Sequence, residues 1–253
     1  AVAVHWFEQS SFAIRDGQGT LTLVDPYSPH DRQPGRYIQA EPPMNETEWP
    51  ADFILLTHAH SDHTHPETLE RVHSAAPNAR YLGSHDSVDQ ILTETSITAD
   101  QCIVVNSGEQ IEIDTMKVDV VYAKPPEGDP DASISPPDTT HLGFVVSAGC
   151  QRLYFSGDPI NTFAKHESLT APIADKRPTV GFLTNHPTEG EFPYFNGCLQ
   201  MAIGCGVQIA CPSHYACFTA RDYDPREWEA EFIAYGLPTR VIPRNSSTVF
   251  GDK

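Results

Sequence analysis

The sequence predicts an α+β fold in which two β-sheets pack face to face and helices cover their outer surfaces, an αββα sandwich. Three observations support this fold class. Short apolar runs of strand length fall into two groups along the chain. Segments with helical periodicity are inserted among these strands. Hydrophobic residues make up 39% of the chain, which is enough to fill a core between two sheets.

The N-terminal part of the chain is expected to begin as a β-meander. The sequence Asp-Gly-Gln-Gly at 16–19 is typical of a turn between strands. Pro66 suits the first position of a helix, and Ser84 suits an N-cap. The expected strands are 2–7, 11–14, 20–24, 53–56 and 80–82, and the expected helices are 66–75 and 84–94.

The rest of the chain contains further strands and two more helices. Residues 124–140 hold five prolines and little apolar content, which indicates a lid over a site. The expected strands are 102–105, 110–113, 117–123, 141–147, 152–156, 180–184 and 207–211, and the expected helices are 196–203 and 225–235. We expect all of 1–253 to form one domain.

Composition limits the classes of function. The formal net charge of −18 repels phosphate backbones and anionic lipid surfaces, so nucleic-acid and membrane partners are not expected. A small-molecule substrate fits better, and neither an anionic substrate nor a homo-oligomer is excluded. The sequence contains no apolar stretch long enough to span a bilayer and no signal pattern, which predicts a cytoplasmic protein.

One short motif carries most of the chemical information. His58, His60, Asp62 and His63 form the pattern H-x-H-x-D-H directly after the apolar run 53–56. Four side chains that can bind metal, within six residues at a strand end, predict a metal site. Nitrogen and oxygen donors suit one or two divalent ions, with Zn²⁺ or Mn²⁺ expected and iron not excluded.

Two further candidates for metal binding also follow predicted strands. Asp158 follows the apolar run Leu153-Tyr154-Phe155, and a carboxylate there could bridge two metals. His214 follows Ile209-Ala210-Cys211 in the same way. A turn aspartate and a lone histidine are common without a metal, so their shared position at strand ends is what favours the functional interpretation.

The order of these residues resembles that of the metallo-β-lactamase superfamily. Within it, the chain is most similar to the L-ascorbate-6-phosphate lactonase group. The matching segments are 24–27, 102–105 before Gly108-Glu109, 153–158, 164–166 and 212–215. The resemblance covers roughly residues 4–250 and implies an αββα sandwich of two mixed sheets with a metal site at one edge.

The resemblance also implies a role for each ligand. His58 and His60 would bind a first metal, and Asp158 would bridge it to a second. The ligands of that second metal would be Asp62, His63 and His214. The chain departs from the pattern where many relatives have a further histidine, because Lys124 and Pro125 stand there. His141 is the best substitute for that missing ligand, and Asp25 is expected to orient a histidine.

Three other residues are expected to contact substrate. His186 ends a predicted strand on the metal side, and Lys165 and His166 follow the Asp158 loop, where they could meet an anionic group. The sequence shows no compact Arg/Lys cluster for a phosphate.

The expected function is metal-dependent hydrolysis, in which a metal-activated hydroxide opens a lactone or cleaves an ester of a sugar acid. Asp62 and Asp158 are the expected catalytic carboxylates. Three alternatives remain open: a phosphodiesterase or nuclease-type hydrolase, a mononuclear iron persulfide dioxygenase, and a non-catalytic scaffold that a metal stabilises. The net charge of −18 disfavours the nuclease.

Overall fold

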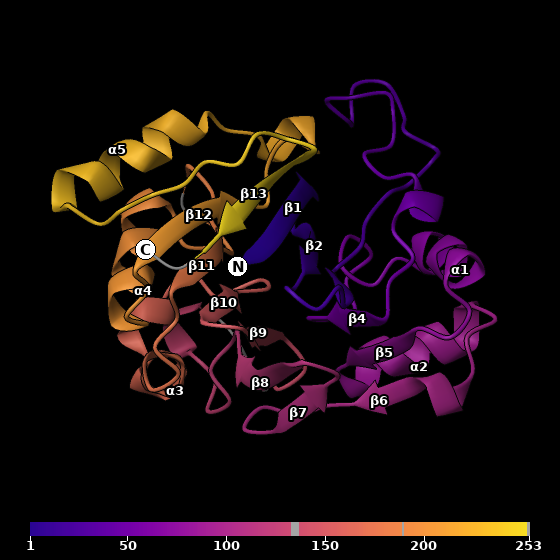
Figure 1. Cartoon of the computed structure of the whole chain (residues 1–253). Coiled ribbons are helices and arrows are strands. Elements are labelled where there is room, and N and C mark those ends of the chain that lie inside the picture. Colours follow the sequence, from indigo (N-terminus) through magenta and orange to yellow (C-terminus); the bar gives the residue numbers. More distant parts are fainter. Residues whose placement is uncertain (133–136, 189, 252–253) are drawn as a thin grey trace.

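The computed structural model describes residues 1–132, 137–188 and 190–251, whose strands form two mixed sheets (Figure 1). Across these residues the first sheet has the order β13 (Ser246–Phe250), β1 (Val2–Glu8), β2 (Ser11–Arg15), β3 (Leu21–Val24), β4 (Phe53–Leu56), β5 (Arg80–Gly83) and β6 (Cys102–Val104). The order of the second is β12 (Ile209–Ser213), β11 (Val180–Thr184), β10 (Gln151–Phe155), β9 (Leu142–Ala148), β8 (Met116–Tyr122) and β7 (Gln110–Ile113). In both sheets, antiparallel and parallel pairs occur together.

Strand β4 shows how the sequence produces the layers. Successive side chains of a strand point to opposite faces of the sheet, so a strand covered on both faces is apolar throughout. Leu55 belongs to the cluster of buried residues between the two sheets. Ile54 and Leu56 belong to a second cluster, on the outer face of the first sheet, together with Leu69 and Ile91 from the helices there. The continuous apolar run therefore places the end of β4 firmly between two packed layers.

Helices cover the outer faces of both sheets. The helices of the described residues are α1 (Pro66–Ala75), α2 (His85–Glu94), α3 (Glu167–Ala174), α4 (Phe195–Gly204) and α5 (Pro225–Tyr235). Helix α2 packs on β5 and β6 and contacts α1, whereas α3 and α4 pack on the second sheet and α5 packs on α4. Figure 1 shows α1 and α2 on one side of the molecule and the other three on the opposite side. Within the described ranges, no helix combines the length and apolar character needed to cross a bilayer.

The predicted αββα arrangement is confirmed, and the predicted helices begin where the sequence signals place them. Pro66 opens α1, and the Ser84 side chain accepts a hydrogen bond from the Ser87 backbone N–H at the start of α2. Helix α3 is not among the predicted elements. It has only eight residues and contains Pro172, which lacks the backbone donor that a helix interior uses.

One predicted strand begins too early, with a consequence for the site. Strand β12 starts at Ile209 rather than at Val207, because the Val207 N–H still closes the turn after α4 by donating to the Ala202 carbonyl (3.0 Å). The strand also ends later than predicted, at Ser213 rather than at Cys211, so His214 follows it directly. Its φ of +67° turns the chain sharply at this point.

Candidate metal centre

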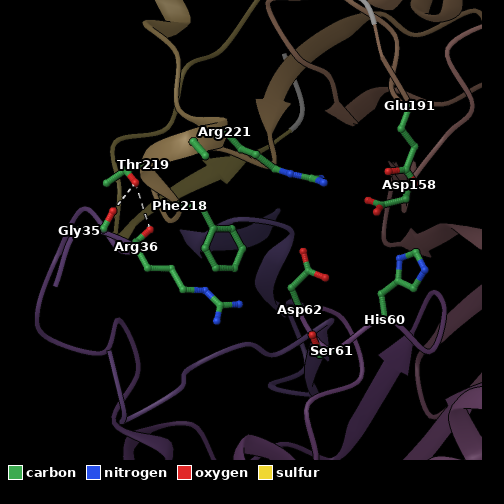
Figure 2. A pocket seen from close by; sticks show the side chains of 11 residues that line it. Gly35, Arg36, His60, Ser61, Asp62, Asp158, Glu191, Phe218, Thr219 and Arg221 are labelled. Atoms are coloured by element: carbon green, nitrogen blue, oxygen red, sulfur yellow. Dashed lines mark hydrogen bonds between the residues drawn. The ribbon is translucent and has the colours of Figure 1, made fainter. Parts of the chain in front are cut away.

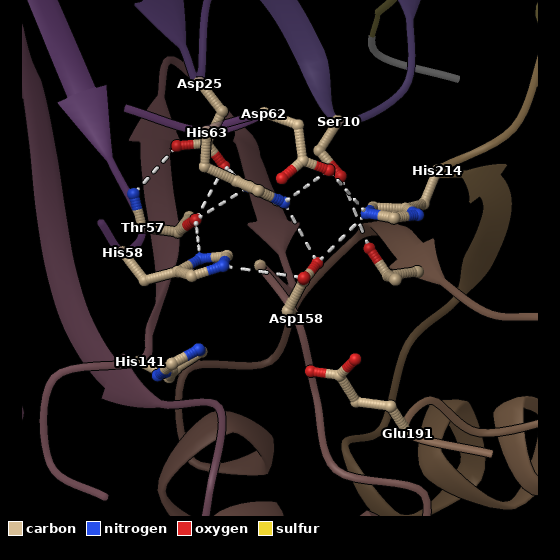
Figure 3. A network of polar contacts seen from close by, with 12 residues as sticks. Ser10, Asp25, Thr57, His58, Asp62, His63, His141, Asp158, Glu191 and His214 are labelled. Atoms are coloured by element: carbon tan, nitrogen blue, oxygen red, sulfur yellow. Dashed lines mark hydrogen bonds and ion pairs between the residues drawn. The ribbon is translucent and has the colours of Figure 1, made fainter. Parts of the chain in front are cut away.

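Polar side chains from both sheets meet at one edge of the sandwich (Figure 3). Residues 57–63 follow β4, Asp158 lies shortly after β10, and His214 follows β12. Strand β9 runs antiparallel to β10, so the start of β9 lies beside the end of β10. His141 immediately precedes β9 and is thereby brought to the same edge. Sheet topology thus gathers residues that are up to 156 positions apart.

The H-x-H-x-D-H motif folds back on itself, which turns its side chains toward one place. The backbone N–H groups of His63 and Thr64 both donate to the His60 carbonyl, at 2.9 and 2.8 Å. His58 and His63 are fully buried, Asp62 retains 19% exposure of its side chain, and His60 is exposed. The motif therefore reaches from the protein interior to the solvent boundary.

The first group of candidate ligands consists of His58, His60 and His141. One ring nitrogen from each lies within 4.8 Å of the others. The rings of His58 and His141 stack with their centroids 4.2 Å apart. The structure therefore places His141 beside His58 and His60, close enough to bind the same metal ion.

The second group consists of Asp62, His63 and His214, again with one donor atom of each within 4.8 Å of the others. The Nε2 atom of His214 lies 3.5 Å from Oδ2 of Asp62. The rings of His63 and His214 are stacked with centroids 5.6 Å apart. The structure thus separates the seven predicted ligands into two trios and Asp158.

Asp158 lies between the two trios and presents one oxygen to each. Its Oδ2 is 3.5 Å from Nε2 of His58, in the first trio. Its Oδ1 is 3.1 Å from Nε2 of His63 and 3.4 Å from Nε2 of His214, both in the second trio. This is the geometry that a carboxylate needs in order to serve two cations at once.

The backbone before Asp158 is so crowded that the residue there must be glycine. Gly157 has a φ of +57°, and a Cβ atom at this position would overlap the carbonyl oxygen of Leu142 in the same sheet and lie only 3.0 Å from Cβ of Thr57, which follows β4 in the other sheet. The Leu142 N–H donates to the Thr57 carbonyl (2.9 Å), so the sheets are joined by a backbone hydrogen bond directly beside the candidate ligands. Because glycine has no Cβ atom, it fits this crowded position and allows the next residue, Asp158, to direct its side chain at the candidate ligands.

Two carboxylates contact the Nδ1 atoms of candidate ligand histidines and restrain the orientation of their rings. Asp25 lies 2.7 Å from Nδ1 of His63, and it also accepts hydrogen bonds from the backbone N–H (2.8 Å) and hydroxyl (2.6 Å) of Thr57. The predicted contact of Asp25 with a histidine of the site is therefore present. Oδ2 of Asp138 forms an ion pair with Nδ1 of His141 at 2.6 Å, although this contact lacks hydrogen-bond geometry. In the first pair, Nε2 of His63 is the nitrogen that faces Asp158.

The electrostatics of the site favour positive charge. Burial alone lowers the pKa of His63, but the neighbouring carboxylates Asp158, Asp25 and Asp62 outweigh burial and raise it well above its usual value. Burial alone raises the pKa of Asp158, but His63, His214 and His58 hold it well below the usual range. By contrast, burial lowers the pKa of His58 and of His60, so the attraction for a cation is centred on His63 and the carboxylates around it.

The donor atoms fit a metal. Buried polar atoms in proteins are normally hydrogen-bonded, so unpaired ones indicate a missing partner. Among the described residues, twelve buried side-chain atoms have no hydrogen bond, and five of them belong to candidate ligands. These five are Nε2 of His58, Nε2 of His63, both ring nitrogens of His141 and Oδ1 of Asp158. Nitrogen and carboxylate donors at such spacing match the preferences of Zn²⁺, Mn²⁺ and Fe²⁺.

Two side chains at the site were not among the sequence candidates. Gln9 donates through Nε2 to Oδ2 of Asp62 (2.9 Å). Its backbone carbonyl accepts from the His214 N–H (2.9 Å), and both residues have positive φ. Glu191 places an oxygen within 4.8 Å of donor atoms of His60 and Asp158. No motif marks either residue, because each reaches the site only through the fold.

The residues predicted to contact substrate are placed differently. His186 lines a hollow that adjoins the cavity in front of the candidate ligands and shares Glu191 and Arg221 with it. His166 lies 2.8 Å from Asp129, within the proline-rich segment 124–140, of which residues 133–136 lie outside the described residues. Lys165 is exposed in a short 3₁₀ turn before α3. Neither Lys165 nor His166 is among the described residues that line the cavity in front of the candidate ligands.

An open cavity of about 460 Å³ lies in front of the candidate ligands (Figure 2). One wall carries His60, Asp62, Asp158 and Glu191, and the facing wall carries Arg36, Phe218 and Arg221. A volume in this range suits a small molecule.

The chain belongs to the metallo-β-lactamase superfamily, because residues 3–176 match the beta-lactamase superfamily domain. Two relatives of known sequence align with nearly the whole chain. It is 25% identical over 243 residues to a UPF0173 metal-dependent hydrolase of Herpetosiphon aurantiacus, which spans 94% of this chain and 93% of the relative. A UPF0173 metal-dependent hydrolase of Deinococcus radiodurans is 26% identical over 248 residues, covering 94% of this chain and 95% of the relative.

Solved structures agree with the fold. The metallo hydrolase Igni18 of Ignicoccus hospitalis aligns over 100% of this chain and 99% of its own, with a TM-score of 0.71 and 20% identity. A possible metal-dependent hydrolase of Veillonella parvula aligns over 98% of this chain and 99% of its own, with a TM-score of 0.74 and 12% identity. The narrower resemblance to the L-ascorbate-6-phosphate lactonase group stays a prediction.

Proposed function

We propose that this protein is a metal-dependent hydrolase that opens a lactone, or cleaves a related ester, of a sugar acid. The observation that carries the proposal is Asp158, whose two oxygens face two separate trios of candidate ligands at the base of a cavity for a small molecule. The superfamily and the hydrolase names of the relatives support the reaction class. The substrate class comes from the sequence resemblance to lactonases.

In this proposal, His58, His60 and His141 would hold one divalent cation, and Asp62, His63 and His214 would hold a second, with Asp158 shared between them. The cations would supply a Lewis acid for the carbonyl group and lower the pKa of water to near neutrality. Zn²⁺ and Mn²⁺ are the expected metals, and iron is compatible with the same donors.

The protein's own side chains would divide the remaining tasks. Asp25 and Asp138 fix the ring orientation of His63 and His141, so that neither ring must be ordered when a substrate enters. Asp62 is partly exposed and lines the cavity, where it would accept the proton that the attacking water loses and pass this proton to the leaving alkoxide. Gln9 donates to Oδ2 of Asp62 and so restrains the carboxylate in a single orientation.

The alternatives are less well supported. A nuclease would need a cationic path for a phosphate backbone, and the chain carries a net charge of −18. A persulfide dioxygenase needs one iron and three protein ligands, whereas this edge gathers seven candidate ligands that the sequence also predicted. A purely structural metal would not require a cavity at the open side of its ligands.

The test is hydrolysis by the metal-loaded protein. Protein loaded with Zn²⁺ or with Mn²⁺ is assayed against a panel of sugar lactones by proton release, and against bis(4-nitrophenyl) phosphate by colour. We expect lactone opening with kcat/KM of at least about 10⁴ M⁻¹s⁻¹ for the preferred lactone. The Asp158→Asn variant serves as the control for adventitious metal catalysis. Cleavage of the phosphodiester without lactone opening would reject the proposal in favour of the nuclease.

A further inference from the structure

The wall of the cavity that faces the candidate ligands carries two arginines that come from distant parts of the chain. Arg36 belongs to the long loop between β3 and β4, and Arg221 ends the 3₁₀ turn Thr219–Arg221 after β12. Both line the cavity together with His60, Asp62 and Asp158. Figure 2 shows the two guanidinium groups extending from this wall toward the side that carries Asp62 and His60.

Backbone hydrogen bonds fix the two arginines on one surface. The Thr219 N–H donates to the carbonyl of Arg36 (3.0 Å), and the Thr219 hydroxyl donates to the carbonyl of Gly35 (2.7 Å). Two residues further along, Ile38 N–H donates to the Cys217 carbonyl (2.9 Å). The loop and the turn are therefore paired like short strands, so Arg36 and Arg221 keep a constant relation to each other.

Aromatic rings hold the guanidinium groups in place. The Cζ atom of Arg36 lies 5.6 Å from the ring centroid of Phe218 and 5.6 Å from that of Tyr37. The Cζ atom of Arg221 lies 5.2 Å from the ring centroid of Phe192. Contacts of this kind restrain an arginine without using its N–H donors, which stay available for a planar anion.

Neither guanidinium has an acidic partner among the described residues, although the chain has 34 Asp and Glu residues. By contrast, Arg32 pairs with Glu8, and Arg71 pairs with Glu46 and Glu67. Ion pairs are present for only four of the eleven arginines of the described residues, so the feature that singles out Arg36 and Arg221 is their shared position on one wall of the cavity.

We propose that Arg36 and Arg221 form an anion-binding subsite, and that the substrate carries a carboxylate or phosphate group away from the bond that is hydrolysed. This proposal rests on the proposed function, and it adds the charge of the substrate and the residues that recognise it. The carboxylate or phosphate group of the substrate accepts hydrogen bonds from the N–H groups of the two guanidinium groups. This contact places the scissile carbonyl at the opposite wall, beside His60 and Asp62.

The kinetic test uses a matched pair of substrates. A γ-lactone bearing a free carboxylate is compared with its uncharged carboxamide, using Zn²⁺-loaded wild type, Arg36→Gln, Arg221→Gln and the double variant. We expect wild type to prefer the carboxylate at least tenfold in kcat/KM, chiefly through KM. We expect the double variant to lose this preference and to retain its rate on the carboxamide within about threefold.

Arg80→Gln is the control. Arg80 is exposed at the start of β5, at the opposite end of the strands from the candidate ligands, so the variant changes the net charge equally without touching the cavity. The preference for the carboxylate should survive in this variant. An equal rate on both lactones in wild type, or an intact preference in the double variant, would overturn the subsite.

A binding measurement separates this proposal from the proposed function. If neither lactone is hydrolysed, the lactonase proposal fails, but the subsite is still tested by calorimetric titration of the Zn²⁺-loaded protein with inorganic phosphate. At least tenfold weaker phosphate binding by the double variant than by wild type and Arg80→Gln supports the subsite. Equal binding by all three proteins refutes it.

Discussion

The two walls of the cavity are built by different means. Behind one wall lie the candidate ligands, which stand at strand ends and most of which are buried, including His58, His63 and Asp158. The facing wall consists of Arg36 and Arg221, which are exposed and lie in a loop and a 3₁₀ turn. The first wall is fixed by the sheets, whereas the second is fixed by a few hydrogen bonds between surface segments.

The difference indicates how the two walls divide the work. Strand ends locked between packed layers can hold reacting groups within the narrow tolerance that catalysis needs. Loop residues vary more easily and suit recognition of the substrate. Substitutions in the first wall should therefore lower kcat and metal binding, whereas substitutions in the second should raise KM for charged substrates.

The largest expected effect comes from Asp158→Asn. The substitution removes the negative charge of the carboxylate that both metals would share, so it weakens the binding of both. The kcat for lactone hydrolysis should therefore fall by about 1,000-fold or more. Metal content per chain should fall as well. Steady-state kinetics and elemental analysis measure the two effects. Asp89→Asn, at an exposed position of α2, is the matched control and should behave like wild type. Retention of more than a tenth of the activity by Asp158→Asn would remove Asp158 from the mechanism.

His141→Ala is expected to have the next largest effect. It removes one of three donors from the first trio and none from the second, so one of two metals should be lost and kcat should fall by about 100-fold. Elemental analysis of protein dialysed against trace metal gives the stoichiometry. His85→Ala, on the exposed face of α2, controls for loss of a histidine. Full metal content in His141→Ala would show that His58 and His60 need no third histidine.

Much of the fold and of the first wall could be predicted from the sequence, because the information there is local. The motif at 58–63 is contiguous in the sequence, and it follows an apolar run of the kind that indicates a strand buried on both faces. Pro66 and Ser84 mark helix starts by their own chemistry. Asp158 and His214 could be placed because each follows an apolar strand.

The remaining features depend on contacts between distant segments. Arg36 and Arg221 are 185 positions apart, and no local pattern indicates that Thr219 pairs their segments. Gln9 reaches Asp62 only because β1 and β12 bring Gln9 beside His214. The position of His166 also depends on the fold. Its closeness to Asp158 in the sequence suggested substrate contact, the structure places it against Asp129, and the substrate contact stays a prediction.

A smaller and more selective effect is expected from the two orienting carboxylates. Asp25→Asn should weaken the metal held with His63, and Asp138→Asn should weaken the metal held with His141, each by about 10- to 100-fold. Competition with a chromophoric chelator measures both affinities. Each variant is the control for the other, because each should leave one affinity unchanged. Equal weakening of both metals by one variant would contradict the assignment of separate trios.

The smallest effect is expected from His166→Ala. Because His166 contacts Asp129 and Thr162 rather than the cavity, kcat/KM for the carboxylate lactone should stay within about twofold of wild type. The lost hydrogen bond should lower Tm by about 2–4 °C, as followed by calorimetry. A tenfold loss of kcat/KM with an unchanged Tm would instead show that His166 contacts the substrate.

The central claim is that two cations share Asp158 at the edge of the two sheets, and anomalous diffraction from crystals of the metal-loaded protein tests it most directly. Data collected on both sides of the zinc, manganese and iron edges locate and identify each metal. We predict two peaks, one among His58, His60 and His141 and the other among Asp62, His63 and His214, with one oxygen of Asp158 directed at each. A single iron peak per chain would contradict the account.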